Sequence, residues 1–126
     1  MLIASEEEEQ IAFAQWLNAK KILFYHIPNE GKRHINYARK LKKMGVSKGV
    51  PDLCIPVPCS HFHGLYIELK RKQGGLISPA QLSWIAKLND KGYKAVIANG
   101  CEEAVKVTEE YFMDSSENKS KILYNK

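Results

Sequence analysis

Two acids and a lysine are spaced in the sequence so that they could bind a divalent metal ion together. Pro51-Asp52 begins one apolar stretch, and Glu68-Leu69-Lys70 ends the next after fifteen intervening residues. Side chains alternate between the two faces of a strand, so Glu68 and Lys70 share a face, about 7 Å apart, and Leu69 points away. Two convergent carboxylates and the backbone carbonyl of Leu69 provide the oxygen ligands that Mg²⁺ prefers, with Mn²⁺ as the expected substitute.

The chemistry that such a metal centre performs is the hydrolysis of a phosphate ester. The ion lowers the pKa of a bound water and neutralises charge on the attacked phosphate. Lys70 would orient that water or stabilise the developing negative charge. In the alternative interpretation, Glu68 and Lys70 form an incidental ion pair on an exposed strand face, and Asp52 is a turn residue after proline. Asp52 begins an otherwise apolar strand, however, which is an unusual position for an acid without a function.

The elements that would position these residues are predicted from apolar spacing and from helix-capping residues. Ser5 and Ser78-Pro79 are typical helix starts, and Gly45 and Gly92 are typical helix ends. We expect one domain, residues 1–112, followed by a polar C-terminal tail, residues 113–126, that is frayed or disordered. The order of elements predicts an α/β fold with a mixed β-sheet flanked by α-helices. We predict helices at residues 5–20, 36–44, 78–92 and 102–112, and strands at residues 22–27, 50–57, 64–70 and 93–98.

The basic residues are concentrated in two segments of this chain, which has 126 residues and a formal net charge of +5. Residues 32–48 carry seven lysines and arginines and no acid, and residues 70–72 form a second basic group, whereas the acids gather at residues 6–9 and 102–110. This distribution favours a polyanionic partner such as DNA; the alternative is a solvated, lysine-rich helix surface. As a group, we predict phosphate contacts from Lys32, Arg33, Arg39, Lys42 and Lys43.

Other sequence features bear on location and on cofactors. The sequence contains no run of 18 apolar residues, and its N-terminus lacks the basic start of a signal peptide, so we expect neither membrane association nor export. Three cysteines are an odd and sparse number, which fits free thiols in a reducing cytoplasm. The alternative is a zinc-stabilised interaction module, although the spacing matches no paired Cys-x-x-Cys pattern. Its candidate ligands are Cys54, Cys59, His61 and His63.

The Pro-Asp and Glu-Leu-Lys segments resemble the signature of the PD-(D/E)XK nuclease superfamily. The surrounding residues resemble one family within it, the virus-type replication-repair nucleases (VRR-NUC), over about residues 5–112. Phage and bacterial members of this family can consist of this domain alone, which would place the protein in the host-cell cytoplasm if it is phage-encoded. The matching residues are 27–33, Gly45-Val46, 48–53, 63–70, Gly75, Leu76, Ser78, Gln81 and Trp84.

The resemblance implies a restriction-endonuclease-like fold and divalent-metal-dependent cleavage of DNA, without a small-molecule cofactor. Single-domain members are homodimeric, structure-specific endonucleases that can resolve four-way (Holliday) junctions, an activity used in DNA repair. By this resemblance, Asp52 and Glu68 become the metal ligands, Lys70 the catalytic lysine, and Gln81 a residue near the active site.

The family also places a glutamate of the first helix at the metal centre, and this chain offers four adjacent candidates. We prefer Glu9, with Glu6 second, because the two share a helix face with Phe13. A rival function from another class is a DNA-binding accessory protein with a non-cleaving, nuclease-like centre. The sequence counts against that rival, since the motif acids and the lysine are all present.

Overall fold

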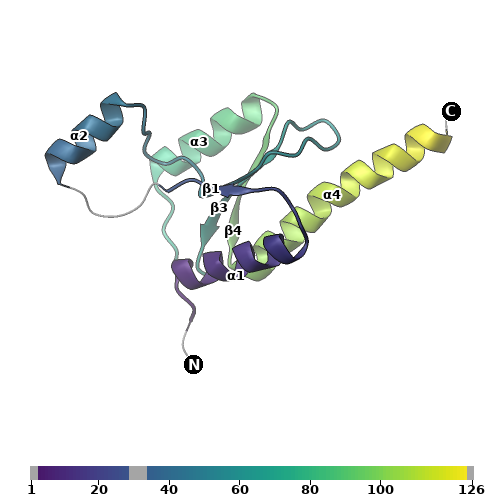
Figure 1. Cartoon of the computed structure of the whole chain (residues 1–126), viewed down its shortest axis with the longest axis horizontal. Coiled ribbons are helices and arrows are strands. Elements are labelled where there is room, and N and C mark those ends of the chain that lie inside the picture. The colour runs from purple at the N-terminus through teal and green to yellow at the C-terminus, as the bar shows by residue number, and fades with distance from the viewer. Residues whose placement is uncertain (1–2, 29–33, 125–126) are drawn as a thin grey trace.

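The computed structural model describes residues 3–28 and 34–124, with side chains described as far as residue 113. The elements in these residues follow the predicted order (Figure 1). They are α1 (Glu6–Ala19), β1 (Tyr25–His26), α2 (Ile35–Lys43), β2 (Leu53–Ile55), β3 (Leu65–Lys70), α3 (Pro79–Asp90), β4 (Lys94–Asn99) and α4 (Cys101–Tyr124).

The four strands form one sheet in the order β1-β2-β3-β4. The first three strands are antiparallel neighbours, with Leu53 of β2 opposite Ile67 of β3. β3 and β4 are parallel, with Leu65 opposite Lys94, and α3 makes the crossover that a parallel pair requires. The predicted mixed sheet is therefore confirmed.

Helices cover both faces of this sheet (Figure 1). On one face, Leu65, Ile67 and Leu69 of β3 are buried against Phe13 of α1 and Tyr111 of α4. α3 packs against β4 on the opposite face. Alternation along β3 directs its remaining side chains away from this core, and these include Glu68 and Lys70.

Both helix starts that the sequence predicts are capping boxes. Ser5 Oγ accepts a hydrogen bond from the backbone N–H of Glu8, and the backbone N–H of Ser5 donates to Glu8 Oε1, both at 3.1 Å. Ser78 and Gln81 make the same reciprocal pair at the start of α3, where Pro79 opens the helix. The hydrogen bonds of this second box fix the orientation of Gln81.

Three element boundaries differ from the prediction. β1 and β2 are shorter than the predicted strands 22–27 and 50–57; Pro28, Pro51 and Pro56 stand close to their ends and lack the N–H that a ladder needs. The predicted end of the last helix at residue 112 is wrong, because the backbone stays helical to Tyr124 instead of forming a frayed tail. No glycine or proline interrupts this stretch. The boundary of the domain at residue 112 stays a prediction.

Among the described residues, no helix is both long and apolar enough to cross a membrane.

Candidate active site

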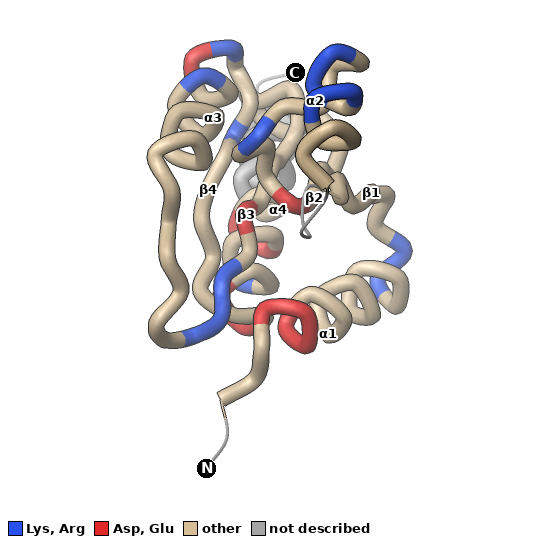
Figure 2. The backbone as a smooth tube through the Cα atoms, turned by 90° about the vertical axis from the view of Figure 1, so that its left-hand side faces the viewer, with Lys and Arg blue, Asp and Glu red and all other residues tan. Residues whose placement is uncertain are grey.

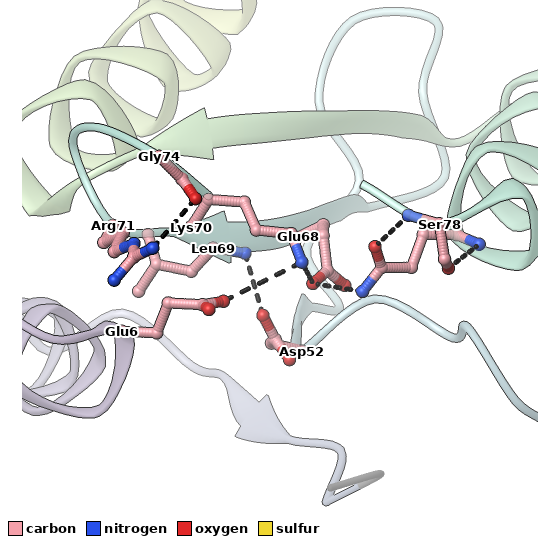
Figure 3. A network of polar contacts seen from close by, with 9 residues as sticks. Glu6, Asp52, Glu68, Leu69, Lys70, Arg71, Gly74 and Ser78 are labelled. Atoms are coloured by element: carbon pink, nitrogen blue, oxygen red, sulfur yellow. Dashed lines mark hydrogen bonds and ion pairs between the residues drawn. The ribbon is translucent and has the colours of Figure 1, made fainter. Parts of the chain in front are cut away.

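A cavity of about 880 Å³ opens between α1, the C-terminal end of β3 and the start of α3. Asp52, Glu68 and Lys70 line it together, so the structure brings the predicted acids and lysine to one place. Figure 3 shows their side chains converging from β3 and from the loop that precedes β2. Gln81 lines the same cavity from α3.

Asp52 is fixed to the strand that carries the other two residues. Its Oδ2 accepts a hydrogen bond from the backbone N–H of Leu69 at 2.8 Å, and the residue is buried. The loop before Asp52 is held against α3 at Gly49, whose φ is +92°. A Cβ at this glycine would lie 2.6 Å from the carbonyl carbon of Ala80. Only glycine therefore permits the close approach that positions Asp52.

Glu68 lies in an environment that disfavours its negative charge. It is 3% exposed, and its Oε2 accepts a hydrogen bond from Gln81 Nε2 at 3.0 Å. Its Oε1 is buried and has no hydrogen-bond partner among the described residues. Burial, and then the charge of Asp52, raise the pKa of Glu68 to about 8, although Lys70 opposes the shift. A cation bound between Glu68 and Asp52 would satisfy both carboxylates, so the two acids fit a divalent ion.

Lys70 is a buried cation held between two carboxylates. Its Nζ lies 3.6 Å from Glu68 Oε2 and 3.8 Å from Glu6 Oε1, and the residue is 6% exposed. Figure 2 shows the acidic first turn of α1 opposite the basic stretch at the end of β3. Glu6, and Glu68 when it is ionised, stabilise the ammonium group and leave it at the cavity.

The two first-helix candidates occupy different places. Glu6 lines the cavity and faces Lys70. Glu9, the preferred residue, is buried away from the cavity; its Oε1 accepts a hydrogen bond from the backbone N–H of Cys101 at 3.0 Å. Cys101 is the first residue of α4, so the carboxylate of Glu9 caps that helix and complements its dipole.

Gln10, His26 and Lys48 also line the cavity and were not among the predicted site residues. His26 of β1 places its Nδ1 2.9 Å from the backbone oxygen of Asp52, and Gln10 Nε2 lies 2.7 Å from the same nitrogen. Lys48 adds a second cation to the cavity wall. The signals in the sequence were weak: His26 ends a short apolar run, and Lys48 belongs to a long basic segment.

The predicted phosphate contacts lie outside the cavity or outside the described residues. Arg39, Lys42 and Lys43 are exposed on α2, a helix without buried residues that stands apart from the sheet in Figure 1. Lys32 and Arg33 lie outside the described residues. The basic surface of α2 is therefore separate from the acidic pair.

The structure does not assemble the alternative zinc site. Cys59 is buried in the hydrophobic core, and the ring of His63 packs edge-on against Tyr93. Within residues 3–28 and 34–124, no three His, Cys, Asp or Glu side chains are grouped as a metal site. Asp52 and Glu68 are the two buried acids of the cavity, which Leu69 and Glu6 also line.

Comparisons with known proteins agree with this geometry. Residues 4–102 match the model of a protein family described as the VRR-NUC domain. A solved structure described as a VRR_NUC domain protein is similar, with a TM-score of 0.81 and 30% sequence identity. The similarity covers 91% of this chain and 93% of that one. No curated protein matches the sequence.

Proposed function

Because the chain belongs to the VRR-NUC family, whose members are DNA-processing nucleases, we propose that it is a divalent-metal-dependent endonuclease that hydrolyses phosphodiester bonds in DNA. The observation that carries the proposal is the state of Glu68. Its carboxylate is buried beside Asp52, its pKa is raised to about 8, and one of its oxygens has no hydrogen-bond partner among the described residues. Groups with such perturbed pKa values, gathered in a cavity, are typical of catalytic sites.

Asp52 and Glu68 would hold Mg²⁺, or Mn²⁺ in its place, and the backbone carbonyl of Leu69 would be the third protein ligand. The bound ion would supply an activated water and neutralise charge on the attacked phosphate. Gln81 positions Glu68, because its amide donates to Oε2. The hydrogen bond from Leu69 does the same for Asp52.

Lys70 would stabilise the negative charge that develops on the phosphate. Its ammonium group is buried at the cavity, where charge interactions are stronger than in water. Glu6 is the first-helix glutamate that we propose for the catalytic centre, since it lines the cavity and faces Lys70. Glu9 does not line the cavity, and its Oε1 is bound at the start of α4, although its Oε2 is buried without a hydrogen-bond partner among the described residues.

We propose branched DNA, including four-way junctions, as the substrate and a homodimer as the active form. Asp52 and Glu68 of one chain line a single cavity together, so paired cuts in the two strands of a junction would draw on the acidic pairs of two chains. The family resemblance supports this assignment, and a role in DNA repair follows from it.

Cleavage assays on labelled four-way junctions and on matched duplex test the proposal. We expect products with Mg²⁺ or Mn²⁺ and none with EDTA. Asp52→Asn and Glu68→Gln should reduce the cleavage rate by at least about 10³-fold while leaving junction binding in Ca²⁺ measurable. Glu103→Gln, at an exposed acid of α4, is the control and should cut at the parental rate. Junction binding without product from the parental protein would instead support an accessory, non-cleaving function.

The same assay distinguishes the two first-helix glutamates. Glu6→Gln should slow cleavage because it removes a carboxylate that faces the cavity and Lys70. Glu9→Ala should leave the cleavage rate nearly intact and lower the free energy of unfolding by about 1 kcal/mol, the usual cost of a lost helix cap. The reverse pattern of rates would assign the metal centre to Glu9.

A further inference from the structure

One wall of the catalytic cavity is apolar and exposed. Ile11 of α1 and the adjacent residues Leu76 and Ile77, from the loop between β3 and α3, line the cavity that contains Asp52 and Glu68. Leu76 is 86% exposed, more than any other large apolar side chain in the described part of the chain. Ile11 and Ile77 are also exposed. Single exposed leucines are common on protein surfaces, but three exposed apolar side chains beside an acidic pair need a partner.

The loop that carries Leu76 is held at both ends. Arg71 Nη2 donates a hydrogen bond to the backbone oxygen of Gly74 at 2.9 Å, and the backbone N–H of Ser78 donates to Gln81 Oε1 at 2.9 Å. A Cβ at Gly75 would lie 3.0 Å from Lys70 Cβ, so the loop backbone rests directly on the catalytic lysine. These contacts fix the loop backbone, so Leu76 has a defined position at the cavity.

Phosphates cannot account for this apolar wall, because they bind to charged and polar groups. In intact duplex DNA the base faces are stacked inside and only the base edges are exposed in the grooves, so an apolar wall gains its largest contact with a base that has left the stack. The size of the cavity, about 880 Å³, lies in the range of sites that bind compact organic molecules. Lys48 and Lys70 line the same cavity and complement the charge of the adjoining phosphate.

We propose that Ile11, Leu76 and Ile77 form a nucleoside-binding wall that receives one unpaired, unstacked base next to the scissile phosphate. This inference rests on the proposed function and makes its substrate class more specific. The enzyme selects DNA with an unpaired nucleotide at the cut site, and the selection comes from apolar contact with the base and not from reading its hydrogen-bonding edge. Leu76 is a specificity-determining residue in this scheme, while the acids and Lys70 perform the hydrolysis.

Binding measurements in Ca²⁺ with three DNAs test the wall directly. The DNAs are a perfect duplex, a fork with unpaired arms, and the same fork with abasic nucleotides at the branch. By fluorescence anisotropy, the parental protein should bind the intact fork about five- to tenfold more tightly than the abasic fork, a ratio at the low end for base contacts. Leu76→Ser should remove most of this ratio without changing the affinity for duplex. Leu23→Ser is the matched control, since Leu23 is also exposed, at 66%, but does not line the cavity.

The outcomes separate this inference from the nuclease assignment. If the parental protein binds the intact and the abasic fork with equal affinity, the proposed nucleoside-binding wall is refuted. This comparison needs no variant. The proposal is also refuted if Leu76→Ser keeps the parental ratio of affinities for the intact and the abasic fork. If the protein cleaves the fork with Mg²⁺ but binds the intact and the abasic fork equally, only the nucleoside-binding wall is refuted. If the protein binds the intact fork more tightly than the abasic fork but does not cleave it with Mg²⁺, only the nuclease activity is refuted.

Discussion

At the scale of the residue, Glu68 connects the chemistry of the site with the stability of the fold. Its pKa is raised from the ordinary value of 4.5 to about 8, first by burial and then by the charge of Asp52. The folded protein therefore keeps a proton that the unfolded chain releases. The stabilising effect is complete below pH 4.5 and is lost as the pH rises to about 8. A site of this kind is prepared for a cation that replaces the proton.

We therefore predict that, in EDTA, the free energy of unfolding of the parental protein decreases between pH 4.5 and 8 by about 2 kcal/mol more than that of Glu68→Gln. The glutamine keeps the shape of the side chain and cannot ionise. Urea unfolding across this pH range measures the difference. Adding Mg²⁺ at pH 8 should restore stability to the parental protein and not to the variant. If the free energy of unfolding changed equally with pH in the two proteins, the raised pKa of Glu68 would be contradicted.

Residue types and strand alternation were sufficient to predict that Asp52, Glu68 and Lys70 lie together, because Glu68 and Lys70 share a strand face and Asp52 precedes the neighbouring strand. The first-helix glutamate could not be chosen in the same way. Helical spacing puts Glu6 and Glu9 on one face but does not show what each of them meets. The partner of Glu9 is 92 residues away in the sequence, at the start of α4.

At the scale of the element, the loop that carries Asp52 depends on its contact with α3. Gly49 and Gly45 both have positive φ, at +92° and +105°, but only Gly49 lies against another backbone. Substitutions at Gly45 and Gly49 therefore allow the effect of backbone conformation to be separated from the effect of packing. Sequence alone could not predict the contact, because it joins a loop to the first turn of a helix that begins about thirty residues later.

We predict that Gly49→Ala lowers the free energy of unfolding by more than Gly45→Ala. A left-handed conformation costs a non-glycine residue about 1–2 kcal/mol, and Gly45→Ala pays only this term because nothing lies within 4 Å of the added Cβ. At Gly49 the Cβ would also collide with Ala80, so Asp52 should shift and cleavage should be lost. Chemical denaturation and junction cleavage measure the two effects. Equal losses of stability in both variants would refute the packing role of Gly49.

The strands show where element prediction failed. The apolar runs at residues 22–27 and 50–57 predicted longer strands than β1 and β2, because apolar composition does not show where the hydrogen bonds of a sheet end. The positions of the helices were predictable from capping residues at Ser5 and Ser78. The end of α4 was not, since a polar segment without glycine or proline can continue a helix.

At the scale of the whole molecule, the acidic pair and the basic surface lie in different parts of the fold. The cavity is formed by the sheet, α1 and α3, whereas Arg39, Lys42 and Lys43 are exposed on α2, which stands apart (Figure 1). Under the proposed function, phosphate binding by α2 and phosphate hydrolysis in the cavity would fall to different elements. A polyanion long enough to contact α2 could then extend into the cavity.

We predict that the combined variant with alanine at Arg39, Lys42 and Lys43 binds junction DNA more weakly and with a smaller dependence on salt. Each lost phosphate contact reduces the slope of log K against log[salt] by about 0.9, so the slope should fall by up to about three. Anisotropy titrations from about 50 to about 300 mM KCl, a range over which such contacts weaken, give the slopes. Alanines at Lys87, Lys91 and Lys106, exposed lysines of other elements, are the control. An unchanged slope in the α2 variant would exclude this helix from the DNA interface.

The hydrogen bond between Glu9 and Cys101 has a consequence for the timing of synthesis. It joins the first helix to the last, across 92 residues that a ribosome needs roughly 5 to 18 s to add. During that interval α1 has no α4 to dock against, and the wall of the cavity that α1 provides is not in place. Only a chain extended past residue 101 can complete the site. A growing chain therefore lacks this support for α1, and for the cavity wall that α1 provides, until the start of α4 has been synthesised.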